Sequence, residues 1–270
     1  MNLPRIGGLF ALPVAVLISN GAAFAQAPTA VMDVVGLKLG MSMADAVAAI
    51  KADNPKLSVQ TQTMVLEGFE QPFATAIVAS QPTESGKDGE EITLLLTTPP
   101  SHQVVWGIQR TYHYGPQSMP SLDSTLAGLR RKYGAENASL LDTDSRNLTK
   151  TIAWAYDTSG KLVAAAPGKA LYLACDAYLG NHFSPIALNN DLHGMASPPQ
   201  CNSVILAKAV LLGGQGPAGA PVLGNLIFQV TNGALYRASV DATRAVATAA
   251  AHARGKKQSE KIDQRGAPKL

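Results

Sequence analysis

The sequence predicts an α+β fold, in which helices pack on one or more antiparallel sheets, as a single unit or as two tandem helix-then-strands units. Capped amphipathic helices are expected after Ser42 and after Ser121. Each is followed by apolar runs separated by Pro, Gly, Asn and Ser, a pattern typical of antiparallel strands. The length of 270 residues and the hydrophobic fraction of 46% exclude a disulfide-stapled miniprotein and a disordered chain.

The first 25 residues have the three parts of a secretory signal peptide. Arg5 precedes an apolar run at 9–18, which is too short to span a bilayer, and Ala23-Phe24-Ala25 provides a cleavage motif. We therefore expect cleavage near Ala25 and a periplasmic or secreted protein of a Gram-negative envelope. A buried N-terminal helix is the alternative. No later apolar run approaches 18 residues, so no transmembrane segment is expected in the mature chain.

The first expected unit covers residues 26–116. Ser42 is placed to cap a helix over 43–53, which should end where Asn54 precedes Pro55. Strands are expected at 57–66, 73–79, 91–97 and 103–114. Two-residue periodicity in the last of these puts the following residues on one face of a central strand: Val104, Trp106, Ile108, Arg110, Tyr112 and Tyr114.

The second expected unit covers residues 117–254. Ser121 caps a helix whose apolar positions end at Tyr133, and Gly134 is the natural stop. Strands are expected at 151–157, 161–165, 169–178, 204–212 and 226–231, with a hairpin turn at 157–160. The alanine-rich segment 234–254 predicts a closing helix, although Asn232-Gly233 could instead turn the chain into a strand over 234–240.

Residues 255–270 are expected to form a basic, disordered tail. From Arg254 onward the chain holds six basic and two acidic residues, so the pI near 8.8 is a property of its end. Such a tail could touch anionic lipid or phosphate, or could simply be solvated. The overall excess of 22 basic over 19 acidic residues is too small to indicate a nucleic-acid partner.

Cys175 and Cys201 are expected to form a disulfide, because an isolated pair in an exported protein is typically oxidised. In the chain-entropy model, closing this loop contributes roughly 3–4 kcal/mol. Free thiols and a zinc site with His182 and His193 are the alternatives. The spacing lacks the short ligand pairs of structural zinc sites, so no metal is expected.

No motif predicts a cofactor or a catalytic residue. The Gly-x-Gly-x-x-Gly match at 214–219 contains Pro217, which removes an amide donor that a dinucleotide site needs, and 142–147 lacks the ligands of a calcium loop. There is no Gly-x-Ser-x-Gly elbow. His182, Asp191 and His193 lie close in sequence, so an envelope hydrolase that uses this loop is an alternative function.

Trp106, Tyr112 and Tyr114 are candidates for a binding face, because large amphipathic rings often anchor interfaces. The alternative is ordinary core. Core is the favoured place for Trp106, whereas Tyr114 is nearer the end of its strand and is expected to be partly exposed.

The segment Gly36-Leu37-Lys38-Leu39-Gly40-Met41-Ser42 with its following helix resembles the helix start of small exported α/β proteins, namely the BamE (SmpA/OmlA) and β-lactamase inhibitory protein families. Residues 129–134, followed by a strand with Trp154, also resemble uncharacterised secreted proteins of proteobacteria. The resemblance implies helices on an antiparallel sheet. Together with the signal sequence and the lack of a coherent catalytic set, it predicts a non-catalytic protein that binds a protein or an envelope component. An enzyme-inhibiting binding module is a further alternative. No lipobox cysteine is present, and the oligomeric state stays open.

Overall fold

The computed structural model describes residues 32–66, 68–81, 87–144, 147–163, 202–212 and 221–263. The expected signal peptide, both cysteines, the glycine-rich motif at 214–219 and the residues His182, Asp191 and His193 lie outside these ranges.

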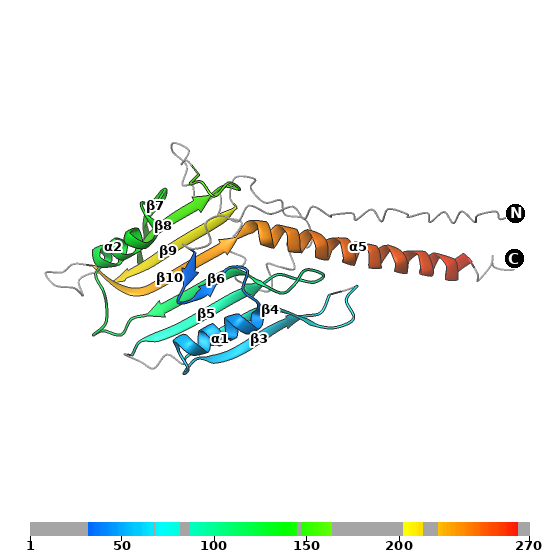
Figure 1. Ribbon diagram of the computed structural model, residues 1–270, viewed down its shortest axis with the longest axis horizontal. Helices are drawn as coiled ribbons and strands as arrows, with labels where there is room; N and C mark the ends of the chain where they lie inside the picture. The colour runs from blue at the N-terminus through cyan, green and yellow to red at the C-terminus, as the bar shows by residue number, and fades with distance from the viewer. Residues whose placement is uncertain are drawn as a thin grey trace, which may run out of the picture.

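The centre of the protein is an eight-stranded antiparallel sheet with the strand order β3-β4-β5-β6-β10-β9-β8-β7 (Figure 1). Its strands are β3 Ser58–Met64, β4 Phe73–Ser80, β5 Gly89–Leu96, β6 Val105–His113, β7 Ala138–Asp144, β8 Asn147–Tyr156, β9 Ser203–Leu212 and β10 Val222–Asn232. A separate two-stranded hairpin is formed by β1 Asp33–Val34 and β2 Leu37–Lys38. The predicted α+β class is therefore confirmed.

The order of helix and strands occurs twice along the chain. Helix α1 (Met43–Asp53) precedes β3 to β6, and helix α2 (Leu122–Tyr133) precedes β7 to β10. The two halves join where β6 pairs with β10, over seven register pairs from Asn225–His113 to Thr231–Gly107. Because each half contributes its last strand to this pair, the junction lies in the middle of one continuous sheet.

Both helices begin and end where the sequence predicts. The Ser42 hydroxyl accepts a hydrogen bond from the Asp45 amide, and the Ser121 hydroxyl accepts one from the Ser124 amide, so each serine satisfies an otherwise free donor of the first turn. Helix α2 ends at Gly134, whose φ of 81° is accessible to glycine at little steric cost.

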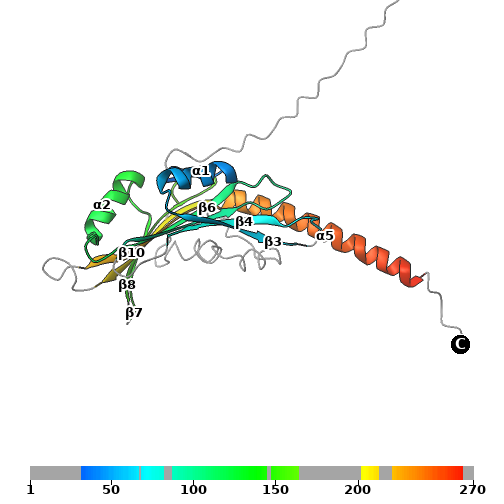
Figure 2. The same ribbon diagram turned by 90° about the horizontal axis from the view of Figure 1, so that it is seen from below.

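The two helices cover the same face of the sheet (Figure 2). Beneath them lies a continuous core that includes Ile50 of α1, Tyr133 of α2, and Ile108, Trp154 and Phe228 of the sheet. Alternation along β8 and β9 turns Ala153 and Leu206 to the opposite face, where they belong to a second core.

Helix α5 (Gly233–Asp263) begins against this second core, where the Tyr236 ring lies 4.2 Å from the Trp106 ring. Three buried hydroxyl groups fix the helix to the loop after β5: Thr98 Oγ1 lies 2.9 Å from Ser239 Oγ and 2.6 Å from Thr243 Oγ1. Burial of polar groups requires such mutual hydrogen bonds. The second half of α5 projects away from the sheet.

The structure differs from the expected secondary structure in two places. Strand β7 was not predicted; it pairs with β8 as far as Asp144 and Asn147. The closing helix predicted over 234–254 is confirmed as part of α5, and the alternative strand over 234–240 is excluded. The part of the expected disordered tail from 255 to 263 is helical as well, because Lys, Gln and Glu favour helix and one glycine costs only about 1 kcal/mol.

The prediction that Trp106 shares a face of β6 with Ile108 is wrong. Leu95 pairs with Gly107 but Leu96 pairs with Val105, so a β-bulge at Trp106 interrupts the alternation. Val105 and Ile108 consequently both join the core under α1 and α2, whereas Trp106 joins the core under α5.

Candidate ligand-binding cleft

An open cleft of about 480 Å³ lies over the central pair of strands, between helix α2 and the hairpin β1–β2. Its volume is within the range of about 300–1,000 Å³ that is typical of small-molecule sites. The lining residues are Asp33, Val34, Val35, Asp88, Arg110, Tyr112, Tyr114, Ser118, Gly128, Leu129, Lys132, Tyr133, Leu226 and Phe228.

The register of β6 and β10 builds the floor of the cleft. Arg110 is opposite Phe228 and Tyr112 is opposite Leu226, so these four side chains lie on one face. The Phe228 ring stacks on Tyr133 of α2, with 5.5 Å between the ring centroids. Apart from Arg110, the floor is therefore apolar and largely aromatic.

The turn of the β1–β2 hairpin forms the opposite wall. Val35 adopts a φ of 47° and is followed by Gly36 at 82°. A left-handed conformation is unfavourable for a β-branched residue, at about 1–3 kcal/mol, so the surrounding structure must impose it. The strained residue is one that lines the cleft.

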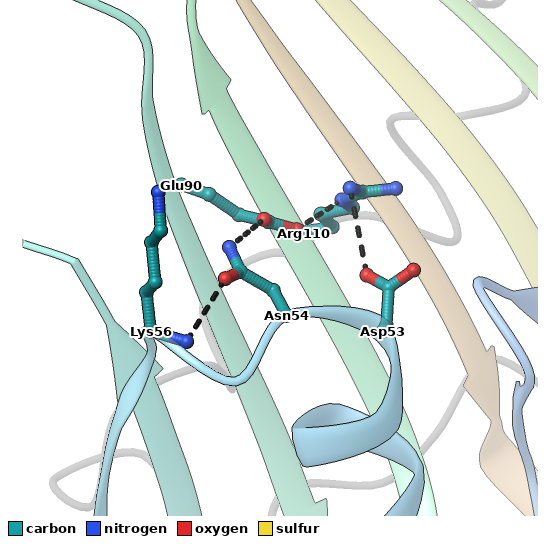
Figure 3. Close-up of polar contacts among 5 residues, drawn as sticks. All are labelled: Asp53, Asn54, Lys56, Glu90 and Arg110. Atoms are coloured by element: carbon teal, nitrogen blue, oxygen red, sulfur yellow. Dashed lines mark hydrogen bonds and ion pairs between the residues drawn. The ribbon is translucent and has the colours of Figure 1, made fainter.

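Arg110 is held in place by a buried carboxylate (Figure 3). Its Nε donates to Glu90 Oε1 at 2.6 Å, and the other Glu90 oxygen accepts from Asn54 Nδ2 at 3.1 Å. Arg110 Nη2 lies 3.9 Å from Asp53 Oδ2, at the end of α1. Among the hydrogen bonds of the described residues, Arg110 uses only its Nε, so the Nη groups keep donors for a further acceptor.

Ion pairs and hydrogen bonds hold the polar residues of the lining in place. Lys132 Nζ lies 3.0 Å from Asp33 Oδ1, and the Tyr133 hydroxyl donates to the Asp33 carbonyl at 3.2 Å. Asp88 accepts from the Ser118 hydroxyl and from the Gly115 amide. These hydrogen bonds lower the pKa of Asp88, Ser118 contributing most, so its carboxylate is ionised at neutral pH.

The tyrosines of the cleft are neutral hydrogen-bonding groups at ordinary pH. Burial is the largest cause that raises the pKa of Tyr112, Tyr114 and Tyr133 above that of a free phenol. The Tyr112 and Tyr114 rings lie 4.7 Å apart, and the Arg110 guanidinium is 5.9 Å from the Tyr112 ring centre. The cleft thus presents apolar ring surface beside hydroxyl and guanidinium donors.

This set of groups suits binding. The lining includes neither histidine nor cysteine, and its one serine, Ser118, donates a hydrogen bond to the Asp88 carboxylate. Within the described ranges, no group of three or more His, Cys, Asp or Glu side chains is arranged to hold a metal ion.

The structure separates the three aromatic residues that the sequence proposes as one binding face. Trp106 is 3% exposed and packs against α5, whereas Tyr112 and Tyr114 are half-buried in the cleft on the other face. The disulfide Cys175–Cys201 and the hydrolase residues His182, Asp191 and His193 fall outside the described residues and stay predictions.

Several residues of the cleft were missed by sequence reasoning. Arg110 had a usable signal, since it is the one charged residue on an otherwise apolar and aromatic strand face. Lys132 lies near the end of a predicted helix and Asp88 lies between two predicted strands, and nothing local in the sequence indicates that both approach β6. Phe228 was expected in a strand, without a partner.

No protein-family model matches the chain, and no curated protein or solved structure gives a significant match. None of the helices in the described part of the chain is both long enough and apolar enough to cross a membrane.

Proposed function

We propose that this protein is a non-catalytic binding protein of the periplasm or the secreted fraction, which holds an amphipathic group of a partner protein or an envelope component in the cleft. The observation that supports this is the pairing of an aromatic floor with Arg110, whose position is fixed by buried Glu90 while its Nη groups, one of them 3.9 Å from Asp53, donate no hydrogen bond among the described residues. The signal features of residues 1–25 support the compartment.

The apolar part of a ligand would cover Tyr114, Leu226 and Phe228. Burial of about 100 Å² of apolar surface contributes roughly 2.5 kcal/mol, so the floor alone supports only modest affinity. A carbonyl, carboxylate or phosphate oxygen would accept hydrogen bonds from Arg110 and set the orientation of the ligand. Because Glu90 already holds the Arg110 guanidinium, this side chain loses little conformational entropy when a ligand binds.

Site-specific photo-crosslinking in cells tests this function. A diazirine analogue of leucine at position 129, in the wall of the cleft, is compared with the same analogue at position 141, which is exposed on β7. We expect a discrete adduct from position 129 only, and its loss when Tyr114→Ala removes part of the floor.

The same adduct from both positions would argue against a specific cleft. The absence of any adduct, together with turnover of a substrate by the purified protein, would replace the binding function by a catalytic one. Far-UV circular dichroism of the Tyr114→Ala protein serves as the folding control.

A further inference from the structure

The outer half of α5 makes an exposed helical arm, which we define as residues 251–263. The inner half is held by buried Tyr236, Val240 and Thr243. The turn between β3 and β4 also approaches the helix, since a Cβ atom on Gly68 would lie 3.0 Å from Ala250 Cβ. Beyond this point every residue from 251 to 262 is exposed, and the helix projects from the body (Figures 1 and 2).

The arm carries charge of one dominant sign. Its basic residues are Arg254, Lys256, Lys257 and Lys261, against Glu260 and Asp263, and the sequence beyond it adds Arg265 and Lys269. Residues 26–253 contain 15 basic and 17 acidic residues. Within the described part of the chain, positive charge is thus concentrated on a helix that stands away from a slightly acidic body.

The composition of the arm excludes insertion into an apolar phase. Ile262 is its only large hydrophobic residue, so there is no apolar stripe of the kind that buries an amphipathic helix in a bilayer interface. The arm can therefore bind only through its charges. Lysine side chains suit such contacts, because their flexible stems let each ammonium group reach an anionic oxygen.

We infer that the arm docks electrostatically on the phosphate groups of an anionic phospholipid surface. Lipid is favoured over other polyanions because the chain is expected to be exported to the envelope. There, the phosphate groups of the lipids form an extended anionic plane along which a straight helix can lie. Each Lys or Arg near such a surface raises partitioning roughly fivefold, and the two acidic residues oppose this. The contact is peripheral, reversible and sensitive to salt.

Vesicle co-sedimentation of the full chain tests this inference, with phosphatidylcholine vesicles and with vesicles that also contain phosphatidylglycerol. We expect binding only to the anionic vesicles, with most of it lost when salt rises from about 0.1 M to about 1 M and the Debye length falls from roughly 10 Å to roughly 3 Å. Reversing three charges, in Lys256→Glu/Lys257→Glu/Lys261→Glu, is expected to lower partitioning at least about tenfold.

The matched control reverses three exposed lysines of the body, in Lys38→Glu/Lys56→Glu/Lys161→Glu, which changes the net charge equally. This control is expected to bind nearly as well as the wild type. Equal loss in both variants, or binding to neutral vesicles, would overturn the inference. Tighter binding to duplex DNA than to anionic vesicles at equal phosphate concentration would also overturn it. The crosslinking experiment tests ligand binding in the cleft and does not depend on lipid binding by the arm. Either proposal can therefore fail without the other.

Discussion

Glu90 shows how one buried side chain ties a helix end to the sheet. One of its carboxylate oxygens accepts from Arg110 and the other from Asn54, the residue that caps the end of α1. Its neighbour Glu91 is exposed. Adjacent residues of one strand therefore carry the same charge in opposite environments.

We expect Glu90→Gln to lower the free energy of unfolding by roughly 1–3 kcal/mol, because a charge-assisted hydrogen bond to Arg110 is lost from a buried site. Glu91→Gln is the matched control and should change the free energy of unfolding by less than about 0.5 kcal/mol. Urea denaturation measures both. Equal effects of the two substitutions would show that the contact with Arg110 does not stabilise the fold.

A second acidic residue predicts a pH dependence. Arg130 donates two hydrogen bonds to Glu136 and lowers the pKa of that carboxyl to about 2. Since the folded pKa is below the unfolded value of about 4.3, the pair stabilises the protein above that pH, and this contribution is lost as pH falls towards 2. Arg130 is about half exposed, which limits the effect to about 1 kcal/mol.

Glu136→Gln should therefore reduce the loss of stability between pH 6 and pH 2.5 by about 1 kcal/mol relative to the wild type. Urea denaturation at both pH values measures the difference. Arg130→Gln should have the same effect, and the double substitution should add nothing further. An unchanged pH dependence in all three variants would contradict the assignment.

At the scale of elements, the ends of helices could be predicted and their partners could not. Ser42, Ser121 and Gly134 act on their own first or last turn, so their signals are local. The bulge at Trp106 depends on how β6 meets β5, and the cleft depends on the approach of α2 and β1–β2 to one strand pair. Strand β7 was missed because its sequence contains alanine and two aspartates, residues that are uncommon in strands.

The contact between the β3–β4 turn and α5 gives a prediction for these elements. Gly68 has a φ of 90°, and a Cβ atom there would also lie 3.3 Å from the Val246 carbonyl oxygen. We expect Gly68→Ala to destabilise the protein by roughly 2 kcal/mol, through strained φ and crowding together. Hydrogen exchange in α5 should become faster.

Gly36→Ala is the control for this prediction, because Gly36 has a φ of 82° and a Cβ atom there would meet nothing within 4 Å. The Gly36→Ala substitution should lower the free energy of unfolding by only about 1 kcal/mol and leave hydrogen exchange in α5 unchanged. If the two substitutions had the same effect on α5, the crowding against Ala250 would not control the docking of the helix.

For the whole molecule, the shared central strand pair predicts cooperative unfolding of the two halves. The chain has two tryptophans, and they report on different halves: Trp106 lies in β6 and Trp154 in β8. Both are buried, so each fluoresces from a packed site. Because β6 and β10 pair along seven register positions, neither half can lose its last strand without exposing the other's.

We expect the single-tryptophan variants Trp106→Phe and Trp154→Phe to unfold in urea with fluorescence midpoints that coincide with circular dichroism in the same variant. The comparison is made within each variant, because the substitutions themselves cost stability. Two separated midpoints in either variant would show that the halves unfold independently.

The position of the junction also governs the order in which the chain can fold during synthesis. Gln109 and Gln229, which are hydrogen-bonded across the central pair, are 120 positions apart in sequence. While the second half is being made, β6 has no β10 to pair with. Such late, non-local pairing slows folding and leaves an open strand edge that can aggregate. The nascent protein is thus most prone to aggregate at β6, the strand that lies in the middle of the finished sheet.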